Sequence, residues 1–197
     1  TTLFRSPLVI DAGALDLVKG LRDYADAQSR SLSRAILTPH HGEAARLLTQ
    51  LGSPRSRADI DADPAASAKE LALLTGAVIL LKSATTVCSY LHHDQGSRTQ
   101  EIVSIPQDTP WAGVAGSGDV LAGAVAGIAA GFQARAERRQ GNPSISEAEC
   151  ATLASLGAWV HAQAAFRAGV GSQGHAHPIQ AIDIARALPE IIGELCS

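Results

Sequence analysis

Short runs of apolar residues alternate along the chain with longer stretches in which apolar residues have the spacing of a helix. The short runs predict a buried β-strand at residues 8–11 and apolar strands at 35–38 and 77–81. Two further strands are predicted at 85–91 and 99–103, on either side of the polar turn 92–98. The longer stretches predict helices at about residues 14–28, 43–52, 63–74, 116–131, 146–168 and 178–195, with polar connectors at 53–64 and 134–144. This alternation predicts an α/β fold with a mostly parallel sheet that is buried on both faces.

Local signals mark several of the helix ends. Asp63 is expected to cap a helix that has Pro64 in its first turn. Ser146 and Glu149 have the spacing of a capping box, so a long helix is expected to begin there. Pro189 lies inside the last predicted helix and can interrupt it.

Polar residues follow three of the predicted strands. Asp11 ends the first strand, the Thr38-Pro39-His40 turn ends the second, and Lys82 ends the third. In parallel α/β sheets, ligands bind outside the carboxyl ends of the strands. The pattern therefore predicts one polar site at this edge of the sheet.

Composition restricts the function. A chain of 197 residues forms one domain, and 46% hydrophobic with 18% charged residues is typical of a globular protein. A net charge of −3 gives no support for binding to nucleic acid or to a membrane surface. No apolar run approaches the roughly 20 residues of a membrane span, and the first residues lack the layout of a signal peptide. Cys88, Cys150 and Cys196 are odd in number and far apart, which favours reduced thiols in a cytoplasmic protein.

The stretch Gly116-Ser117-Gly118-Asp119 stands where a loop is expected to become a helix. Free N–H groups and the positive end of the helix dipole make an anion site there, an anion hole formed by Gly116, Ser117 and Gly118. A carboxylate beside a bound phosphate, such as that of Asp119, is suited to take a proton from an attacking hydroxyl. Alternatively, Asp119 only favours the helix dipole and the glycines only allow tight packing.

The other polar residues near the strand ends also have two interpretations each. Lys82 follows a fully apolar strand, so its charge needs either a nucleotide phosphate or a protein carboxylate as partner. His40 offers a hydrogen bond to a ligand or lies on the surface, and Glu43 serves the site or only favours a helix dipole. Asp11 is a ligand to metal or substrate, or an acid that caps a loop.

The remaining histidines and a run of arginines are expected to be surface groups. The histidines lie in a polar turn and a glycine-rich loop, without the cysteine or acid cluster of a metal site: His92, His93, His175 and His177. The arginines form a basic run that is typical of a solvated face: Arg135, Arg138 and Arg139.

Four stretches, LVIDAGALDLV, ILTPHHGEAARLL, VILLKSATTV and AGVAGSGDVLAGAVAGIAAG, together resemble in this order the ADP/ATP-dependent NAD(P)H-hydrate dehydratases of the ribokinase-like superfamily. The resemblance continues to the terminal PIQAIDIARALPEII. The combination of T-P-H-x-G-E with A-G-S-G-D-V-L-A-G is specific, whereas G-x-G-D alone would indicate only a ribokinase-like protein. The resemblance implies a three-layer ribokinase-like sandwich that forms a single domain over residues 1–197.

The resemblance also implies a repair reaction. Hydration of the nicotinamide ring turns NADH or NADPH into a hydrate that dehydrogenases cannot use. Enzymes of this family phosphorylate the new hydroxyl from ADP or ATP with Mg²⁺, phosphate is eliminated, and the ring double bond returns. The implied partners are hydrated NADH or NADPH and an adenine nucleotide, with no nucleic acid and no membrane.

Roles for single residues follow from the resemblance. Asp119 would be the base on the substrate hydroxyl and contact the substrate, His40 would contact the hydrate, and Gly118 would cradle nucleotide phosphate. Glu43 would help to organise Mg²⁺ through water. The adenine-nucleotide site would be lined by Lys82, Ser83, Ala84, Thr85 and Thr86.

This chain departs from the family pattern at a few positions and in length. Ser83 stands where glycine is expected, Gly13 replaces a second acid, and His41 replaces proline or alanine. Family members carry roughly another third of a domain upstream. We therefore expect the chain to correspond to the C-terminal two-thirds of a family domain, with its N-terminal portion and part of the substrate site lacking.

Two other functions compete with the dehydratase. A ribokinase-like kinase of a small alcohol would use the same Asp119 and Gly118 but release a stable phosphorylated product. A nucleotide-binding remnant would bind without turnover. The resemblance further suggests a homo-oligomer, such as a tetramer.

Overall fold

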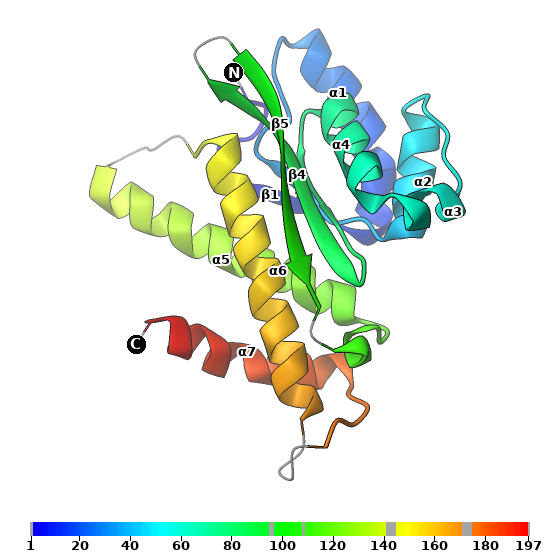
Figure 1. Ribbon diagram of the computed structural model, residues 1–197. Coiled ribbons are helices and arrows are strands. Elements are labelled where there is room, and N and C mark those ends of the chain that lie inside the picture. The colour runs from blue at the N-terminus through cyan, green and yellow to red at the C-terminus, as the bar shows by residue number, and fades with distance from the viewer. Residues whose placement is uncertain (1, 95–96, 108, 141–144, 171–174, 197) are drawn as a thin grey trace.

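A five-stranded sheet lies between two groups of helices in the computed structural model, which describes residues 2–94, 97–107, 109–140, 145–170 and 175–196 (Figure 1). The strands follow one another in the order β1 (Leu8–Ile10), β2 (Ala35–Leu37), β3 (Val78–Leu81), β4 (Thr85–Asp94) and β5 (Ser97–Pro106). One face carries the 3-10 turn η1 (Ala12–Leu17) and the helices α1 (Val18–Ala27), α2 (His41–Gln50), α3 (Arg57–Ala62) and α4 (Pro64–Thr75). After the turn η2 (Pro110–Ala112), the other face carries α5 (Ser117–Gln140) and α6 (Glu147–Gly169), with α7 (Ala181–Cys196) packed against them.

The sheet is half parallel and half antiparallel. The first three strands run parallel, with Val9 opposite Ile36 and Ile36 opposite Val78. From β3 onward the pairs are antiparallel, because only residues 82–84 separate β3 from β4 and a parallel crossover needs a dozen residues or more. The three-layer α/β architecture predicted from the sequence is confirmed, with a mixed sheet in place of a mostly parallel one.

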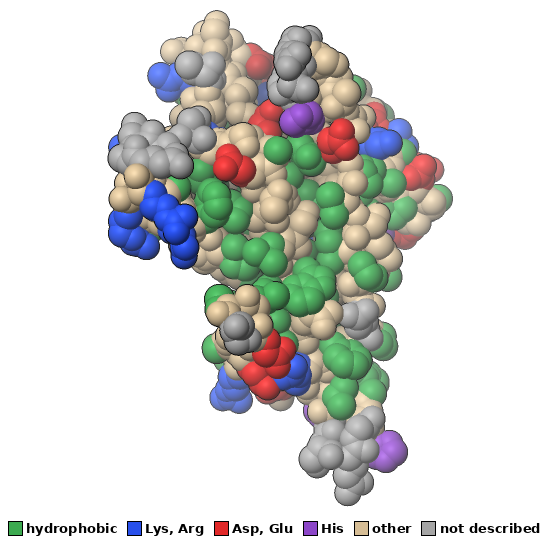
Figure 2. All heavy atoms as spheres, turned by 60° about the vertical axis from the view of Figure 1, so that its left-hand side comes forward, with side chains coloured by type: hydrophobic (Ala, Val, Ile, Leu, Met, Phe, Trp, Pro, Cys, Tyr) green, Lys and Arg blue, Asp and Glu red, His purple; other side chains and the backbone are tan. Residues whose placement is uncertain are grey.

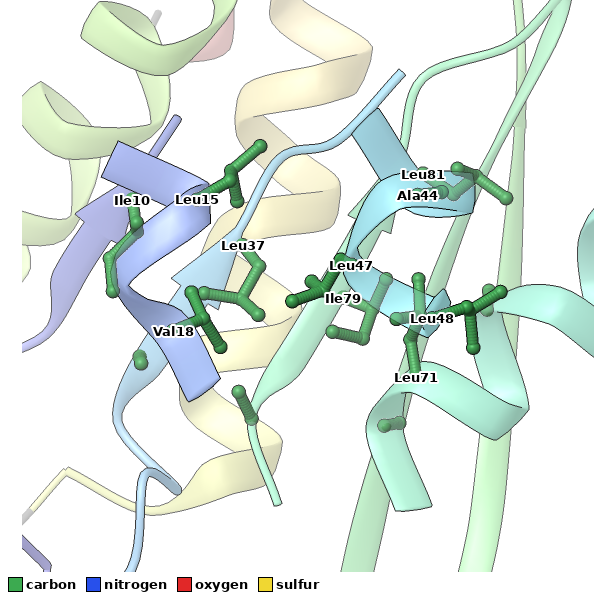
Figure 3. Close-up of a cluster of buried hydrophobic side chains, with 14 of the residues drawn as sticks. Ile10, Leu15, Val18, Leu37, Ala44, Leu47, Leu48, Leu71, Ile79 and Leu81 are labelled. Atoms are coloured by element: carbon green, nitrogen blue, oxygen red, sulfur yellow. The ribbon is translucent and has the colours of Figure 1, made fainter. Parts of the chain in front are cut away.

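Alternating residues of the central strands fill two separate cores. Leu37, Ile79 and Leu81 point toward α1, α2 and α4 (Figure 3). Ile36 and Leu80 point the other way, toward α5 and α6. Burial on both faces explains why these strands are continuous apolar runs in the sequence.

Most helix ends lie where local signals predict them. The Asp63 carboxylate accepts a 2.8 Å hydrogen bond from the Ala66 N–H, and Pro64 occupies the first turn of α4. Gly76 ends that helix at φ +66°, a left-handed conformation that glycine adopts without cost. The predicted capping box of Ser146 and Glu149 opens α6, so this prediction is confirmed.

Three segments differ from the prediction. The polar connector contains α3, which a second capping box of Ser56 and Asp59 opens. Helix α5 continues to Gln140, because the alanines, arginines and glutamate after residue 133 are good helix formers. Pro189 lies within α7 without ending it. Residues 95–96 of the predicted turn and 141–144 of the second connector lie outside the described residues.

None of the helices that the structure describes is both long and apolar enough to cross a membrane.

Apolar side chains reach the surface between charged groups on the side where α5 and α7 lie (Figure 2). The large exposed ones on the last three helices include Phe132, Trp159, Phe166, Ile182 and Ile192. Exposed apolar surface favours association, and the expected homo-oligomer stays a prediction.

The three cysteines are expected to differ sharply in reactivity. Burial raises the pKa of Cys88 to about 11 and that of Cys150 to about 12, whereas Cys196 is exposed at the end of α7. Only a thiolate reacts, so a disulfide reagent at neutral pH should label Cys196 alone in the folded protein and all three thiols in denaturant. Mass spectrometry of the labelled protein measures this. Rapid labelling of Cys88 or Cys150 in the folded protein would contradict the packing of α6 on β4.

Candidate active site

A cavity of about 990 Å³ opens where the parallel strands end and helix α5 begins. Asp11 follows β1, His40 lies between β2 and α2, and Lys82 follows β3. Gly118 and Asp119, in the first turn of α5, also line this cavity. The structure therefore brings together the polar residues that the sequence places at three strand ends and at one helix start.

Lys82 lies at the centre of this cluster. Its Nζ is 2.7 Å from Asp11 Oδ1 and 3.7 Å from Glu43 Oε2. A Cβ added to Gly118 would be 3.2 Å from the same Nζ, so the ammonium lies against the start of α5. Of the two partners that the sequence allows for Lys82, the structure shows the carboxylates, and the ammonium also lies against the first turn of α5.

Asp11 is held as a charge partner and not as a cap. Its carboxylate makes no capping hydrogen bond to η1. It accepts a 2.7 Å hydrogen bond from the Thr38 hydroxyl in addition to the Lys82 contact. A backbone hydrogen bond also joins the ends of β2 and β3, because the Lys82 N–H donates to the Pro39 carbonyl at 2.8 Å.

His40 and Glu43 form a capping box at the start of α2. His40 Nδ1 accepts from the N–H groups of Gly42 and Glu43 at 3.0 and 3.3 Å, so the ring proton of the neutral imidazole is on Nε2. The Glu43 carboxylate accepts from the His40 N–H at 2.8 Å and is buried. Sequence analysis did not foresee a histidine cap, because Ser, Thr, Asp and Asn are the usual residues there. Both side chains still line the cavity.

The first turn of α5 has the features of an anion site. Gly116 has φ +85°, and a Cβ there would also lie 3.2 Å from Ala181 Cβ. The Ser117 N–H is already used, since it donates to the Val114 carbonyl at 3.1 Å. In the described part of the chain, the N–H groups of Gly118 and Asp119 meet no acceptor. The donors that remain for an anion in this part of the described chain are therefore the N–H groups of Gly116, Gly118 and Asp119.

The segment after Lys82 contributes unequally to the cavity. Ser83, Ala84 and Thr86 line it, whereas Thr85 is not among the lining residues. The Thr86 hydroxyl donates to the Ser83 carbonyl and accepts from Gln107, both at 3.4 Å. This places Thr86 as a support of the cavity wall.

Several lining residues carried no sequence signal of their own. Arg57 comes from α3, inside the stretch predicted as a polar connector, and Gln107 and Thr109 come from the segment after β5. His161 lies in the middle of α6, within a stretch that only predicted a helix. The arginines of the basic run are exposed, as expected for a solvated face: Arg135, Arg138 and Arg139.

Burial of His161 makes folding sensitive to acid. Burial lowers the pKa of His161 from 6.5 to about 4, so the unfolded chain binds this proton at a pH where the folded protein does not. The free energy of unfolding therefore falls as the pH drops from 6.5 to 4, by up to about 3 kcal/mol from this residue. Urea unfolding at pH 7 and pH 4.5 measures the loss, and the variant His161→Gln should lose less. Equal losses in both proteins would contradict the burial of a neutral imidazole.

The charges around the cavity favour a metal–nucleotide complex over a free nucleotide. Three carboxylates, those of Asp11, Glu43 and Asp119, line the cavity with two cations, the Lys82 ammonium and the Arg57 guanidinium. Within the described residues, no three Asp, Glu, His or Cys side chains are close enough together to hold a metal ion. Mg²⁺ fits such a site, because it is usually bound by one or two carboxylates together with phosphates and water.

Comparison with known sequences shows which family the chain belongs to. The family described as NAD(P)H-hydrate dehydratase matches residues 2–186. The ADP-dependent (S)-NAD(P)H-hydrate dehydratase of Neisseria meningitidis serogroup B is 34% identical over 163 residues, which are 81% of this chain and 44% of that protein. The bifunctional NAD(P)H-hydrate repair enzyme of Leishmania major is 40% identical over 133 residues, 62% of this chain and 21% of that protein. The chain spans less than half the length of these relatives.

Solved structures show the same fold. The ADP/ATP-dependent NAD(P)H-hydrate dehydratase from Bacillus subtilis, co-crystallised with ATP and Mg²⁺, aligns with a TM-score of 0.60 at 23% identity over 95% of this chain and 55% of its own. A ribokinase-like superfamily protein from Enterococcus faecalis V583 aligns with a TM-score of 0.59 at 22% identity over 95% of this chain and 52% of its own. At such low identity these matches concern the fold alone, and they confirm the predicted ribokinase-like architecture.

Proposed function

Because the chain belongs to the NAD(P)H-hydrate dehydratase family, we propose that its cavity phosphorylates hydrated NADH or NADPH and then eliminates phosphate. The observation that carries the proposal is the meeting of three groups in one cavity: the Lys82 ammonium, the free N–H groups at the start of α5, and the Asp119 carboxylate. An ammonium and free N–H groups stabilise a transferring phosphoryl group, and a carboxylate beside them can accept a proton. The net reaction is loss of water from the hydrate, driven by a nucleotide, so the enzyme would be a hydro-lyase.

Asp119 has the position of the general base. It lies in the first turn of α5, one residue after Gly118, and its side chain is exposed to the cavity. Asp119 would take the proton of the ring hydroxyl as the hydroxyl oxygen bonds to the terminal phosphorus and the bond to the leaving nucleotide oxygen breaks. With ADP as donor, the products of this step are AMP and the phosphorylated hydrate.

Elimination completes the repair. Phosphate is a far better leaving group than hydroxide, and the lone pair of the ring nitrogen expels it. Loss of a proton from the neighbouring ring carbon then restores the double bond. The free N–H groups of Gly118 and Asp119 would stabilise the departing phosphate as they would stabilise the transferring group.

Different residues would hold the nucleotide and the metal in this proposal. Ser83, Ala84 and Thr86 would line the adenine-nucleotide site, with Thr85 beside it. His40 would contact the hydrate through Nε2, the ring nitrogen that does not cap α2. When bound, Mg²⁺ would neutralise phosphate charge. Glu43 would act on it through water, because its carboxylate already serves the capping box.

A single assay separates this function from its competitors. The protein is mixed with NADH hydrate, Mg²⁺ and either ADP or ATP, and the near-ultraviolet absorbance of reduced nicotinamide is followed. We expect the absorbance to return with at least one of the two nucleotides, which also identifies the donor. Nucleotide consumption only with another alcohol would indicate a small-molecule kinase, and nucleotide binding without turnover would indicate a binding remnant. Either result would overturn the proposal.

A further inference from the structure

His161 is the one buried imidazole of the cavity wall, and the proposed chemistry does not use it. His161 lies in the middle of α6, and only 4% of its surface is exposed to solvent. Nε2 lies 3.1 Å from the Ser117 carbonyl oxygen and 3.1 Å from the Ser117 hydroxyl. The contact joins residues 44 positions apart in the sequence and ties α6 to the first turn of α5.

The proton of this imidazole is fixed by its surroundings. A carbonyl oxygen can only accept, so Nε2 carries the proton and donates it toward Ser117. Nδ1 is buried and meets no partner among the described residues. A second proton on Nδ1 would therefore have no acceptor, so the ring stays neutral and keeps one orientation.

The hydrogen bond from His161 to the Ser117 carbonyl also fixes the direction of the Gly118 N–H, because both groups belong to the same peptide plane. The Ser117 carbonyl and the Gly118 N–H belong to one planar trans peptide group, so they point in opposite directions. Holding the carbonyl toward α6 aims the Gly118 N–H away from α6. That N–H meets no acceptor among the described residues, and Gly118 lies against Lys82 Nζ. A hydrogen bond at the carbonyl end also polarises the N–H and makes it a better donor.

We propose that His161 is a positioning residue that holds the Ser117–Gly118 peptide so that the Gly118 N–H faces the bound phosphoryl group. It does not touch the substrate. The identity of the anion rests on the proposed function, whereas the orientation of the peptide does not. Asp119, which follows in the same turn, depends on the same support.

Three variants separate positioning from mere packing. His161→Leu removes the donor and keeps most of the volume, and His161→Gln keeps an N–H group at the position of Nε2. Leu153→Ala is the matched control, because Leu153 is buried in the same helix but does not line the cavity. A packing role would make Leu153→Ala and His161→Leu behave alike.

The first measurement needs no catalysis. Nitrogen NMR of the wild type should show the tautomer protonated at Nε2. Titration with inorganic phosphate should shift the amide signals of Gly118 and Asp119, with an affinity about tenfold weaker in His161→Leu. The affinity should stay within about twofold of the wild type in His161→Gln and Leu153→Ala. The Nδ1 tautomer, no phosphate response at these amides, or equal affinity in His161→Leu would overturn the proposal.

The second measurement uses the dehydratase assay on the same proteins. His161→Leu should lower kcat by about tenfold or more with a smaller change in KM, because a displaced donor acts mainly on the transition state. His161→Gln should recover most of the rate. If the wild type binds phosphate as described but regenerates no NADH, the proposed function fails and the positioning role stands. If kcat is unchanged in folded His161→Leu, the positioning role fails and the proposed function stands.

Discussion

Replacing Asp119 by Asn should lower kcat of NADH regeneration by about a hundredfold to ten-thousandfold and leave nucleotide affinity within about threefold. The amide cannot accept the hydroxyl proton at the moment the phosphorus bond forms. It fills the same volume in the exposed first turn of α5, so the fold is expected to survive. Steady-state kinetics and isothermal titration with nucleotide and Mg²⁺ measure the two quantities.

Asp183→Asn is the control for this variant. Asp183 is also an acid in the first turn of a helix, α7, and it does not line the cavity. It should therefore change the helix dipole interaction without affecting the rate. A near-normal kcat in Asp119→Asn, or an equal loss of kcat in Asp183→Asn, would show that Asp119 is not the base.

Replacing Lys82 by Met should weaken nucleotide binding by about ten- to a hundredfold and also destabilise the fold. The affinity falls because the variant loses the ammonium that lies against Gly118. The fold weakens because the buried Glu43 and the partly buried Asp11 lose the cation between them, at a cost of about 3 kcal/mol. Nucleotide titration and urea unfolding at neutral pH measure the two effects.

Lys69→Met provides the comparison, because Lys69 is an exposed lysine on α4 outside the cavity. Its free energy of unfolding should change by less than about 0.5 kcal/mol. If Lys82→Met binds nucleotide as tightly as Lys69→Met, then Lys82 only holds the three strand ends together and the phosphate site lies elsewhere.

The positions of Asp11, His40 and Lys82 were predictable because a parallel sheet brings strand ends to one edge. Each residue follows an apolar run, and periodicity alone places the three together. Their partners were not predictable in the same way. The sequence allowed either a phosphate or a carboxylate as the partner of Lys82. Only the packing of α2 and β1 in the fold brings Glu43 and Asp11 to it.

His161 shows where periodicity gives no information about function. Its neighbours Val160 and Ala162 are as buried as it is, so the stretch reads as an apolar helix with one polar residue. What gives His161 a partner is the crossing of α6 over the first turn of α5, a contact of high sequence separation. Local propensity likewise could not place α3, because its capping box stands inside a stretch rich in Asp, Arg and Pro.

The central claim is that one cavity both phosphorylates the hydrate and eliminates phosphate. Its most direct test is to measure, in one reaction of this chain with hydrated NADH, Mg²⁺ and the nucleotide that supports regeneration, the NADH regenerated, the inorganic phosphate released and the product nucleotide formed (AMP from ADP, or ADP from ATP). The account predicts equal amounts of all three, and none of them above background with Asp119→Asn. A phosphorylated hydrate that accumulates without NADH, or product nucleotide without NADH, would contradict it.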